Sequence, residues 1–241
     1  MLISGKNSVK EALLSGKTCD KVYILSGNTD RQLGEIVRLA KDGGARVIYS
    51  EKAALDKLAP DGRHQGAVAE LSEYKYAELG DVLECAAERG EEPLILILDG
   101  VQDPMNLGAV LRSAECLGAH GVVIGKHRAV SVNETVVKTS AGAAEYVLCV
   151  KATNVNDVIR ELKDNFFTVY AAEADGVPAD GVSLKGSTAI VIGGEGEGVK
   201  RLTRELCDGV LSIPMNGKIN SLNASVAAGI MLYECARQRK A

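Results

Sequence analysis

The sequence has few aromatic side chains: no tryptophan, two phenylalanines and seven tyrosines among 241 residues. A surface that stacks unpaired bases needs aromatic rings, so this composition does not indicate one. No apolar run approaches the roughly 20 residues that span a bilayer, and the first residues lack the apolar core of a signal peptide. We therefore expect a soluble protein of the cytoplasm.

Patterns for binding metals or forming disulfides are also missing. The six cysteines are scattered and form no Cys-x-x-Cys pair, which is typical of reduced thiols rather than of a zinc site or a disulfide framework. The three histidines, His64, His120 and His127, have no metal-ligand spacing. We expect no metal site.

The net charge of −4 does not point to nucleic acid, because nucleic-acid-binding domains are usually basic. The charge is uneven along the chain, however. Residues 1–72 hold eleven Lys/Arg and nine Asp/Glu, and the remainder holds seventeen and twenty-three. The first part is therefore the better candidate for contact with RNA, by a small excess.

Residues 1–72 alternate helical and strand-like patterns and predict a small separate α/β unit, followed by a polar linker at 73–76. Residues 77–241 alternate strands and helices along their whole length, which predicts a mostly parallel sheet between helical layers. The expected strands are 94–98, 121–124, 146–150, 168–172, 189–192 and 210–213. From this pattern alone the second domain would be Rossmann-like and unknotted, because knots are rare.

Three segments carry more polar and glycine residues than a strand-to-helix connection needs. Residues 99–112 read Asp-Gly-Val-Gln-Asp-Pro-Met-Asn-Leu-Gly-Ala-Val-Leu-Arg, and residues 192–199 read Ile-Gly-Gly-Glu-Gly-Glu-Gly-Val. Residues 216–229 place four small polar residues at a helix start where one N-cap would suffice: Asn220, Ser221, Asn223 and Ser225. In this order the segments resemble the three motifs of the SpoU/TrmH family, S-adenosylmethionine-dependent RNA ribose 2′-O-methyltransferases of the SPOUT class.

The resemblance is strong over residues 99–237 and weaker over 1–72. It implies a C-terminal SPOUT α/β domain, residues 77–241, whose trefoil knot is made from segments near 190–198 and 211–225. It implies that residues 1–72 form an L30e-like domain that binds the RNA substrate. It also implies a homodimer built through the C-terminal domain, which the long apolar helix expected at 222–239 favours.

The glycine-rich segment has two other interpretations. Gly194, Gly196 and Gly198 have the spacing G-x-G-x-G rather than G-x-G-x-x-G, and Glu195 and Glu197 would repel a pyrophosphate. A nucleotide-dependent oxidoreductase is therefore disfavoured, whereas a cationic sulfonium is compatible with nearby carboxylates. The segment could also be a plain turn whose glutamates lie favourably at a helix N-terminus.

The resemblance assigns cofactor contacts to Gly193, Gly194, Ile213, Met215 and Leu222, although Ile213 and Leu222 on their own would be core residues. It assigns catalysis to Asn106, Arg112, Glu195, Ser221 and Asn223. Taken alone, Asn106 would be an N-cap and Arg112 a solvated or ion-paired residue. Because arginine stays protonated, we expect Arg112 to grip a phosphate and stabilise the forming alkoxide. Either Ser221 or Asn223 could cap the last helix while the other faces the site.

Two weaker matches complete the picture. Lys6, Asn7, Arg63, His64 and Gln65 are polar groups of the L30e-like domain that could meet RNA, or could form an exposed polar loop. Residues 138–144 fit the family's small-residue segment, or a close packing contact between helices, which we favour.

We therefore expect a metal-independent 23S ribosomal RNA guanosine-2′-O-methyltransferase of the cytoplasm. The alternatives are a transfer RNA enzyme of the same family and a catalytically silent RNA-binding ribosome-assembly factor.

Overall fold

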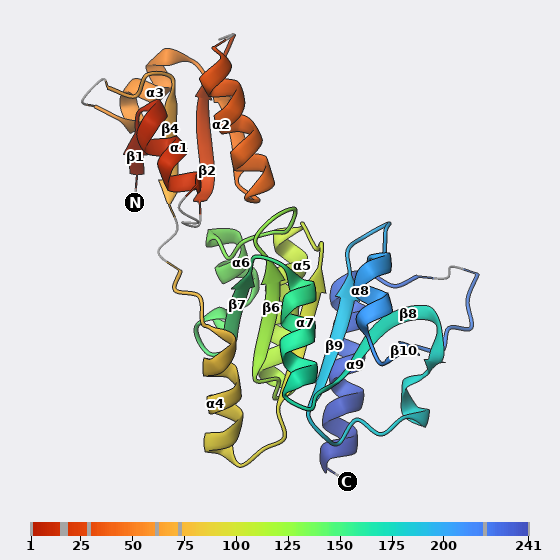
Figure 1. Cartoon of the computed structure of the whole chain (residues 1–241). Coiled ribbons are helices and arrows are strands. Elements are labelled where there is room, and N and C mark those ends of the chain that lie inside the picture. The colour runs from red at the N-terminus through yellow and green to blue at the C-terminus, as the bar shows by residue number, and fades with distance from the viewer. Residues whose placement is uncertain are drawn as a thin grey trace. The chain divides into compact units, whose positions relative to one another are not determined.

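The computed structural model describes residues 2–14, 19–27, 30–60, 63–71, 74–218 and 221–240. The chain divides into two compact units (Figure 1). One comprises Met1–Lys75 with Lys126–Glu134, and the other comprises Tyr76–Gly125 with Thr135–Ala241. No pattern in the sequence indicated that the segment Lys126–Glu134 would join the first unit. No helix in the described part of the chain is long and apolar enough to cross a membrane.

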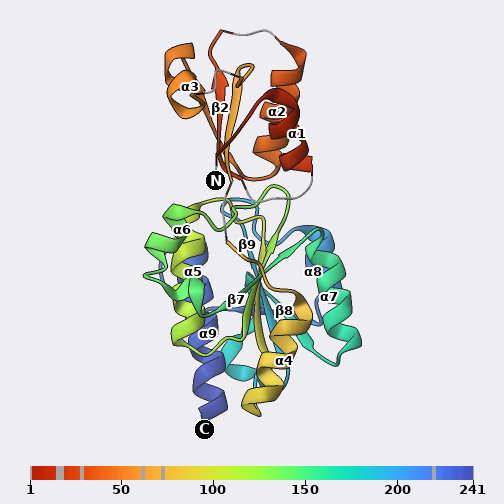
Figure 2. The same cartoon turned by 90° about the vertical axis from the view of Figure 1, so that its left-hand side faces the viewer.

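The first unit is a four-stranded sheet with helices on both faces. The strand order is β1 (Leu2–Ser4), β4 (Ala67–Leu71), β2 (Cys19–Leu25) and β3 (Arg46–Ser50). β2 and β3 are parallel, and β4 is antiparallel to β1 and β2. α1 (Lys6–Leu14) and α2 (Arg31–Asp42) cover one face and α3 (Lys52–Leu58) the other, as Figure 2 shows. The strand β1, which spans three residues, was not predicted.

Two apolar clusters hold this unit together, one on each face of the sheet. Val9 of α1 and Ile36 of α2 pack against Val22 and Ala69 on one face. Leu55 of α3 packs against Val68 on the other. All six side chains are completely buried, so each helix is fixed by the apolar stripe that it buries rather than by its intrinsic propensity.

The second unit contains a six-stranded sheet in which every pairing is parallel, which confirms the prediction. The strand order is β10 (Gly209–Ser212), β8 (Thr168–Pro178), β9 (Thr188–Gly193), β5 (Leu94–Asp99), β6 (Gly121–Gly125) and β7 (Leu148–Ala152). All six residues of β5 are buried, as expected of a strand covered on both faces.

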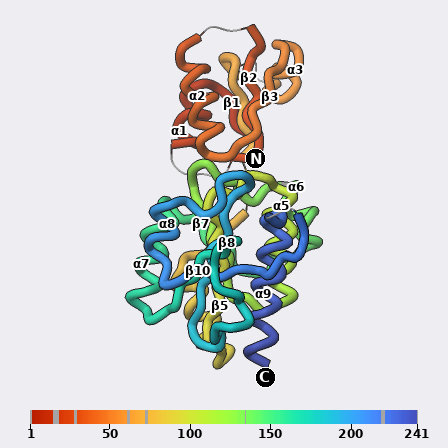
Figure 3. Tube along the Cα trace, turned by 90° about the vertical axis from the view of Figure 1, so that its right-hand side faces the viewer, coloured from red at the N-terminus to blue at the C-terminus, as the bar shows by residue number. Residues whose placement is uncertain are grey.

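Helices cover both faces of this sheet, as Figures 2 and 3 show from opposite sides. α7 (Val155–Asp164) and α8 (Arg201–Leu206) lie on one face. The other face carries α5 (Pro104–Cys116), α6 (Glu134–Thr139) and α9 (Ala224–Lys240). α4 (Leu79–Arg89) packs through Leu79 and Val82 on the cluster that contains Ile159 of α7.

The helices α5 and α6 pack closely at Gly108. A Cβ atom at this position would lie 2.6 Å from Cβ of Thr139 and 3.0 Å from the carbonyl oxygen of Val136. Ser140, Ala143 and Ala144 are buried nearby in the sequence. The small-residue segment 138–144 therefore forms a helix packing contact, the interpretation that we favoured.

The start of α5 corrects one prediction. Asp103, not Asn106, is the N-cap: its carboxylate accepts the N–H of Met105 over 3.1 Å, and Pro104 follows at the first helical position. Proline suits that position because it has no N–H to leave unpaired. Asn106 consequently lies inside the first turn and is buried.

Candidate active site

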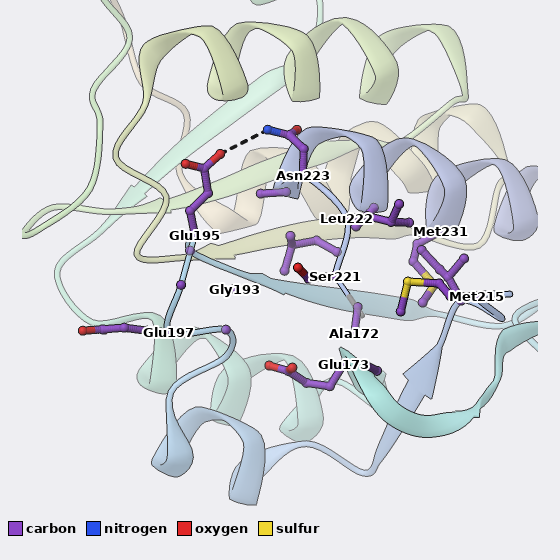
Figure 4. Close-up of a pocket in the computed structure, with 18 residues that line it drawn as sticks. Ala172, Glu173, Gly193, Glu195, Glu197, Met215, Ser221, Leu222, Asn223 and Met231 are labelled. Atoms are coloured by element: carbon purple, nitrogen blue, oxygen red, sulfur yellow. Dashed lines mark hydrogen bonds between the residues drawn. The ribbon is translucent and has the colours of Figure 1, made fainter. Parts of the chain in front are cut away.

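A cavity of about 660 Å³ opens where β9 and β10 reach their carboxyl ends, beside the middle of β8. Ligands of open parallel sheets bind at this edge, and the volume is typical of small-molecule sites. Its walls come from three parts of the chain: the middle of β8, the glycine loop (residues 193–198), and the segment that leads from β10 into α9. Figure 4 shows these walls around the cavity.

The structure brings all five sequence-predicted cofactor residues into these walls: Gly193, Gly194, Ile213, Met215 and Leu222. Leu222 is 41% exposed, so it is not the core residue that its apolar character alone would suggest. Ser221 and Asn223 line the same cavity.

Close backbone approaches explain two of the glycines. A Cβ atom at Gly193 would lie 2.0 Å from the carbonyl carbon of Gly198, and one at Gly194 would lie 2.5 Å from the carbonyl oxygen of Gly100. No side chain fits at these distances. The glycine loop can therefore fold back on itself, and against the end of β5, only because both positions lack a side chain.

Glu195 joins two asparagines from distant parts of the chain. Its Oε1 accepts the amide N–H of Asn106 on α5 over 2.7 Å and that of Asn223 over 3.1 Å. Figure 4 shows the second of these bonds. Since a carboxylate only accepts hydrogen bonds, both amides must present their nitrogen atoms to it.

Asn223 also caps the helix that follows it. Its Oδ1 accepts the backbone N–H groups of Ser225, over 2.9 Å, and Val226, over 3.3 Å. It is therefore the N-cap of α9 as well as a partner of Glu195. The sequence suggested that capping and facing the site would fall to two different residues, and the structure combines them in one.

A second cavity, of about 410 Å³, adjoins the first. Its walls are Gly100, Val101, Gln102, Asp103, Asn106 and Glu195. Glu195 lines both cavities, so the Asn106–Glu195–Asn223 cluster lies where they meet. Groups bound in the two cavities would thus both lie against Glu195.

Arg112 lies apart from this cluster. It is exposed on α5, lines neither cavity, and is roughly 120° around the helix from Asn106. No hydrogen bond or ion pair joins it to any residue that the structure describes. The structure therefore brings together four of the five predicted catalytic residues within one subunit, and not the fifth.

Four of the five predicted RNA-binding residues are at least partly accessible, and His64 is not. Lys6 donates its backbone N–H to Oε1 of Gln65 over 3.3 Å, so two segments distant in sequence meet. His64 is only 4% exposed; its Nδ1 accepts the N–H of Gly66 over 2.9 Å and its Nε2 bonds Asp56 over 3.0 Å. His64 is thus a structural residue rather than part of an exposed polar loop.

The side chain of Lys6 also has a partner within the first unit. Its ammonium group forms an ion pair with Asp30. The hydrogen bond from Lys6, together with the N–H of Gln32, lowers the pKa of the Asp30 carboxyl below its usual value. Asn7, next to Lys6 in the sequence, and Arg63, next to His64, are exposed.

Sequence reasoning missed one acidic residue of the first cavity. Glu173, in the middle of β8, lines its wall, and Figure 4 shows the carboxylate directed toward the glycine loop. Its position after the apolar stretch of β8 was the only available signal.

Among the described residues, no group of three or more His, Cys, Asp or Glu side chains could hold a metal ion.

A parallel sheet with a polar cluster and two adjoining cavities at its carboxyl edge is the arrangement expected of a domain that binds a small molecule beside a second ligand. Residues 93–233 match the SpoU rRNA Methylase family, and residues 2–77 match the RNA 2′-O ribose methyltransferase substrate binding family. The chain belongs to the SpoU/TrmH family of RNA methyltransferases.

Known proteins of this family are similar along their whole length. The "Putative TrmH family tRNA/rRNA methyltransferase YacO" of Bacillus subtilis is 41% identical over 239 residues, which cover 98% of this chain and 95% of that protein. A crystal structure of an RNA 2′-O ribose methyltransferase has a TM-score of 0.57 at 26% identity and covers 100% of this chain and 89% of its own.

The SpoU methyltransferase AviRb from Streptomyces viridochromogenes, solved in complex with AdoMet, shares the fold. Its TM-score is 0.65 at 24% identity, over 100% of this chain and 91% of that one.

Proposed function

We propose that this chain transfers a methyl group from S-adenosylmethionine to the ribose 2′-hydroxyl of a guanosine in 23S ribosomal RNA. The observation that carries the proposal is the Asn106–Glu195–Asn223 cluster at the meeting point of two cavities. Methyl transfer needs donor and acceptor aligned on opposite sides of the reacting carbon, and most of its acceleration comes from such positioning.

The first cavity suits S-adenosylmethionine. Ile213, Leu222 and Met231 offer apolar surface for an adenosyl group, and the loop backbone at Gly193–Gly194 offers neutral polar groups. Its charged lining residues are Glu173, Glu195 and Glu197, which complement a cation and oppose a phosphate. When bound, the cofactor supplies an electrophilic methyl group. The segments near 190–198 and 211–225 that form these walls are those of the trefoil knot that we propose.

Within this site Glu195 orients the acceptor. Oε1 is occupied by the two asparagine amides, which leaves Oε2 to accept a hydrogen bond from the 2′-hydroxyl. Asn106 lines the second cavity and holds the carboxylate from the side on which the ribose enters. Ser221 lines the cofactor side and completes the polar wall.

Arg112 acts across a homodimer interface. α9 exposes an apolar stripe, with Val226, Ile230 and Tyr233 exposed by 48%, 39% and 59%. These residues follow each other at helical spacing and form one face, and covering it with a second copy stabilises both. Because Arg112 faces neither cavity of its own subunit, we propose that it grips the RNA phosphate in the partner's site.

The first unit recruits the RNA in the cytoplasm. Its match to a substrate-binding family supports an L30e-like role, with Lys6, Asn7, Arg63 and Gln65 as contacts. Ribosomal RNA is favoured over transfer RNA because this additional domain gives the enzyme a second surface that can contact a large structured RNA.

Transfer of tritiated methyl groups tests the proposal. Purified protein is incubated with labelled S-adenosylmethionine and either unmodified 23S RNA or unmodified transfer RNA. We expect label in 23S RNA, at the 2′-oxygen of one guanosine. Label in transfer RNA alone would replace the substrate with the alternative, and no label in either RNA would favour a silent binding protein.

A further inference from the structure

Two carboxylates hold the end of the glycine loop from opposite sides. The N–H of Val199 donates to Oε1 of Glu173 over 2.5 Å, and the N–H of the next residue, Lys200, donates to Oδ2 of Asp99 over 3.0 Å. Glu173 belongs to β8 and Asp99 to β5, the two strands that flank β9. The backbone amides of Val199 and Lys200 are thus bound by carboxylates from β8 and β5, the two strands on either side of β9.

Asp99 also holds the start of the loop. Its backbone carbonyl accepts the N–H of Gly194 over 3.0 Å, while its carboxylate binds Lys200 at the other end. The carboxylate is almost completely buried and forms an ion pair with the half-exposed ammonium group of Lys200. One residue therefore closes the loop by binding both of its ends.

Because residue 198 is a glycine, the carboxylate of Glu173 can reach the backbone amide of Val199. A Cβ atom there would lie 2.6 Å from Oε1 of Glu173. Gly198 also has a φ of +66°, a conformation that other residues rarely adopt. Within the loop, the N–H of Gly198 donates to the carbonyl oxygen of Gly194 over 3.1 Å. The loop is therefore closed by its own backbone and anchored by the two carboxylates.

We infer that Asp99 and Glu173 are positioning residues that act together as a carboxylate clamp on the glycine loop. The clamp fixes the loop that presents Glu195 to Asn106 and Asn223, and it shapes the wall of the cavity that Glu173 itself lines. This inference rests on the proposed function, because the cavity is taken to bind S-adenosylmethionine.

Paired substitutions test the clamp. Asp99→Asn and Glu173→Gln keep a side-chain oxygen that can accept the amide, whereas Asp99→Ala and Glu173→Ala remove it. Loss of an acceptor for a part-buried amide should weaken S-adenosylmethionine binding by roughly tenfold or more. Asp99→Asn should bind within about threefold of the natural protein, since a neutral oxygen still accepts the bond. Glu173→Gln should bind more tightly than Glu173→Ala for the same reason, although it also loses a charge that faces the cofactor. Calorimetry measures each dissociation constant.

Asp175→Ala is the matched control. Asp175 lies two residues from Glu173 and binds the side chain of Arg204 on α8 over 2.8 Å, not a backbone amide. It lies outside the cavity walls, so its loss should leave binding unchanged. The clamp is refuted if both Ala variants bind as tightly as the natural protein, or if Asn and Gln bind as weakly as Ala.

Amide hydrogen exchange without cofactor separates failure of the clamp from failure of the proposed function. In the natural protein the Val199 and Lys200 amides should exchange slowly. Asp99→Ala should accelerate exchange at Lys200 first, and Glu173→Ala at Val199 first. If the natural protein does not bind S-adenosylmethionine, the proposed function fails while these rates still decide on the clamp; unchanged rates in both variants would overturn it.

Discussion

The amide of Asn106, inside the first turn of α5, donates to Oε1 of Glu195 in the glycine loop over 2.7 Å. Asn223, at the start of α9, donates to the same oxygen over 3.1 Å. The two asparagines and the glutamate come from three separate motifs. This shared oxygen connects the three motifs directly in the structure.

Substitutions can separate the two roles of Asn223, which caps α9 and donates to Glu195. Asn223→Ala removes both the N-cap and the donor to Glu195, so it should lower the free energy of unfolding by about 1 kcal/mol and also reduce turnover. Asn223→Asp keeps an oxygen that caps α9 but places a negative charge opposite Glu195. It should lose less stability than Asn223→Ala, because the cap is kept, and still lose turnover. Urea denaturation and single-turnover rates measure the two effects, and equal loss of stability in both variants would contradict this division.

Arg112→Ala should reduce turnover on the order of 100- to 1000-fold, as expected for loss of a donor that stabilises developing charge. Binding of S-adenosylmethionine should not change, because Arg112 lies outside the cofactor cavity. Arg112→Lys should restore little, since a point charge does not reproduce the planar guanidinium. Single-turnover rates decide this, and a near-natural rate for Arg112→Ala would show that the assignment is wrong.

Mixing subunits tests whether Arg112 acts in the partner's site. Arg112→Ala and Glu195→Gln should each be nearly inactive. A mixed dimer would contain one site with an intact Glu195 from one subunit and an intact Arg112 from the other. Each mixed dimer should therefore have about half the activity of a natural dimer. Random exchange at 1:1 makes about half of the dimers mixed, so the mixture should recover about one quarter of the natural activity. If no activity appears although mixed dimers form, Arg112 does not act across the interface.

The apolar stripe of α9 predicts a dimer that one charge can break. Ile230→Glu places a carboxylate in the middle of the exposed face formed by Val226, Ile230 and Tyr233. A buried unpaired charge is costly, so sedimentation should change from dimer to monomer at micromolar concentration. Arg160→Glu, on the exposed face of α7, is the control and should leave the protein a dimer. A monomer in the natural protein would contradict the proposed interface.

His120 predicts a specific pH dependence of stability. Its Nδ1 accepts the N–H of Leu94 over 3.0 Å, and its Nε2 bonds Glu91. Burial lowers the pKa of the ring below its usual value of 6.5, against the opposing effect of Glu91. The unfolded chain therefore binds a proton first as pH falls below about 6.5, so the free energy of unfolding decreases there until the folded-state pKa is reached. Urea denaturation from pH 7.5 downward should show a smaller decrease in His120→Asn.

The parallel sheet of the second unit could be predicted because its central strands are continuous apolar runs such as residues 94–98. That the proposed cofactor residues lie together could be predicted because they cluster in motifs, and the structure places them around one cavity. β1 could not, since three residues carry no periodic pattern. His64 was misjudged because burial depends on Asp56 and Gly66, which no local pattern connects to it. Glu173 was missed because it lies in none of the three motifs, and its partner amide, at Val199, is 26 residues away in the sequence.

The most direct measurement of the central claim is a map of 2′-O-methyl groups in the RNA of cells with and without this gene. Loss of the gene should remove the methyl group from one guanosine of 23S RNA. The natural gene should restore it, and the Asn106→Ala variant should not. An unchanged 23S map, or restoration by Asn106→Ala at the natural level, would contradict the account.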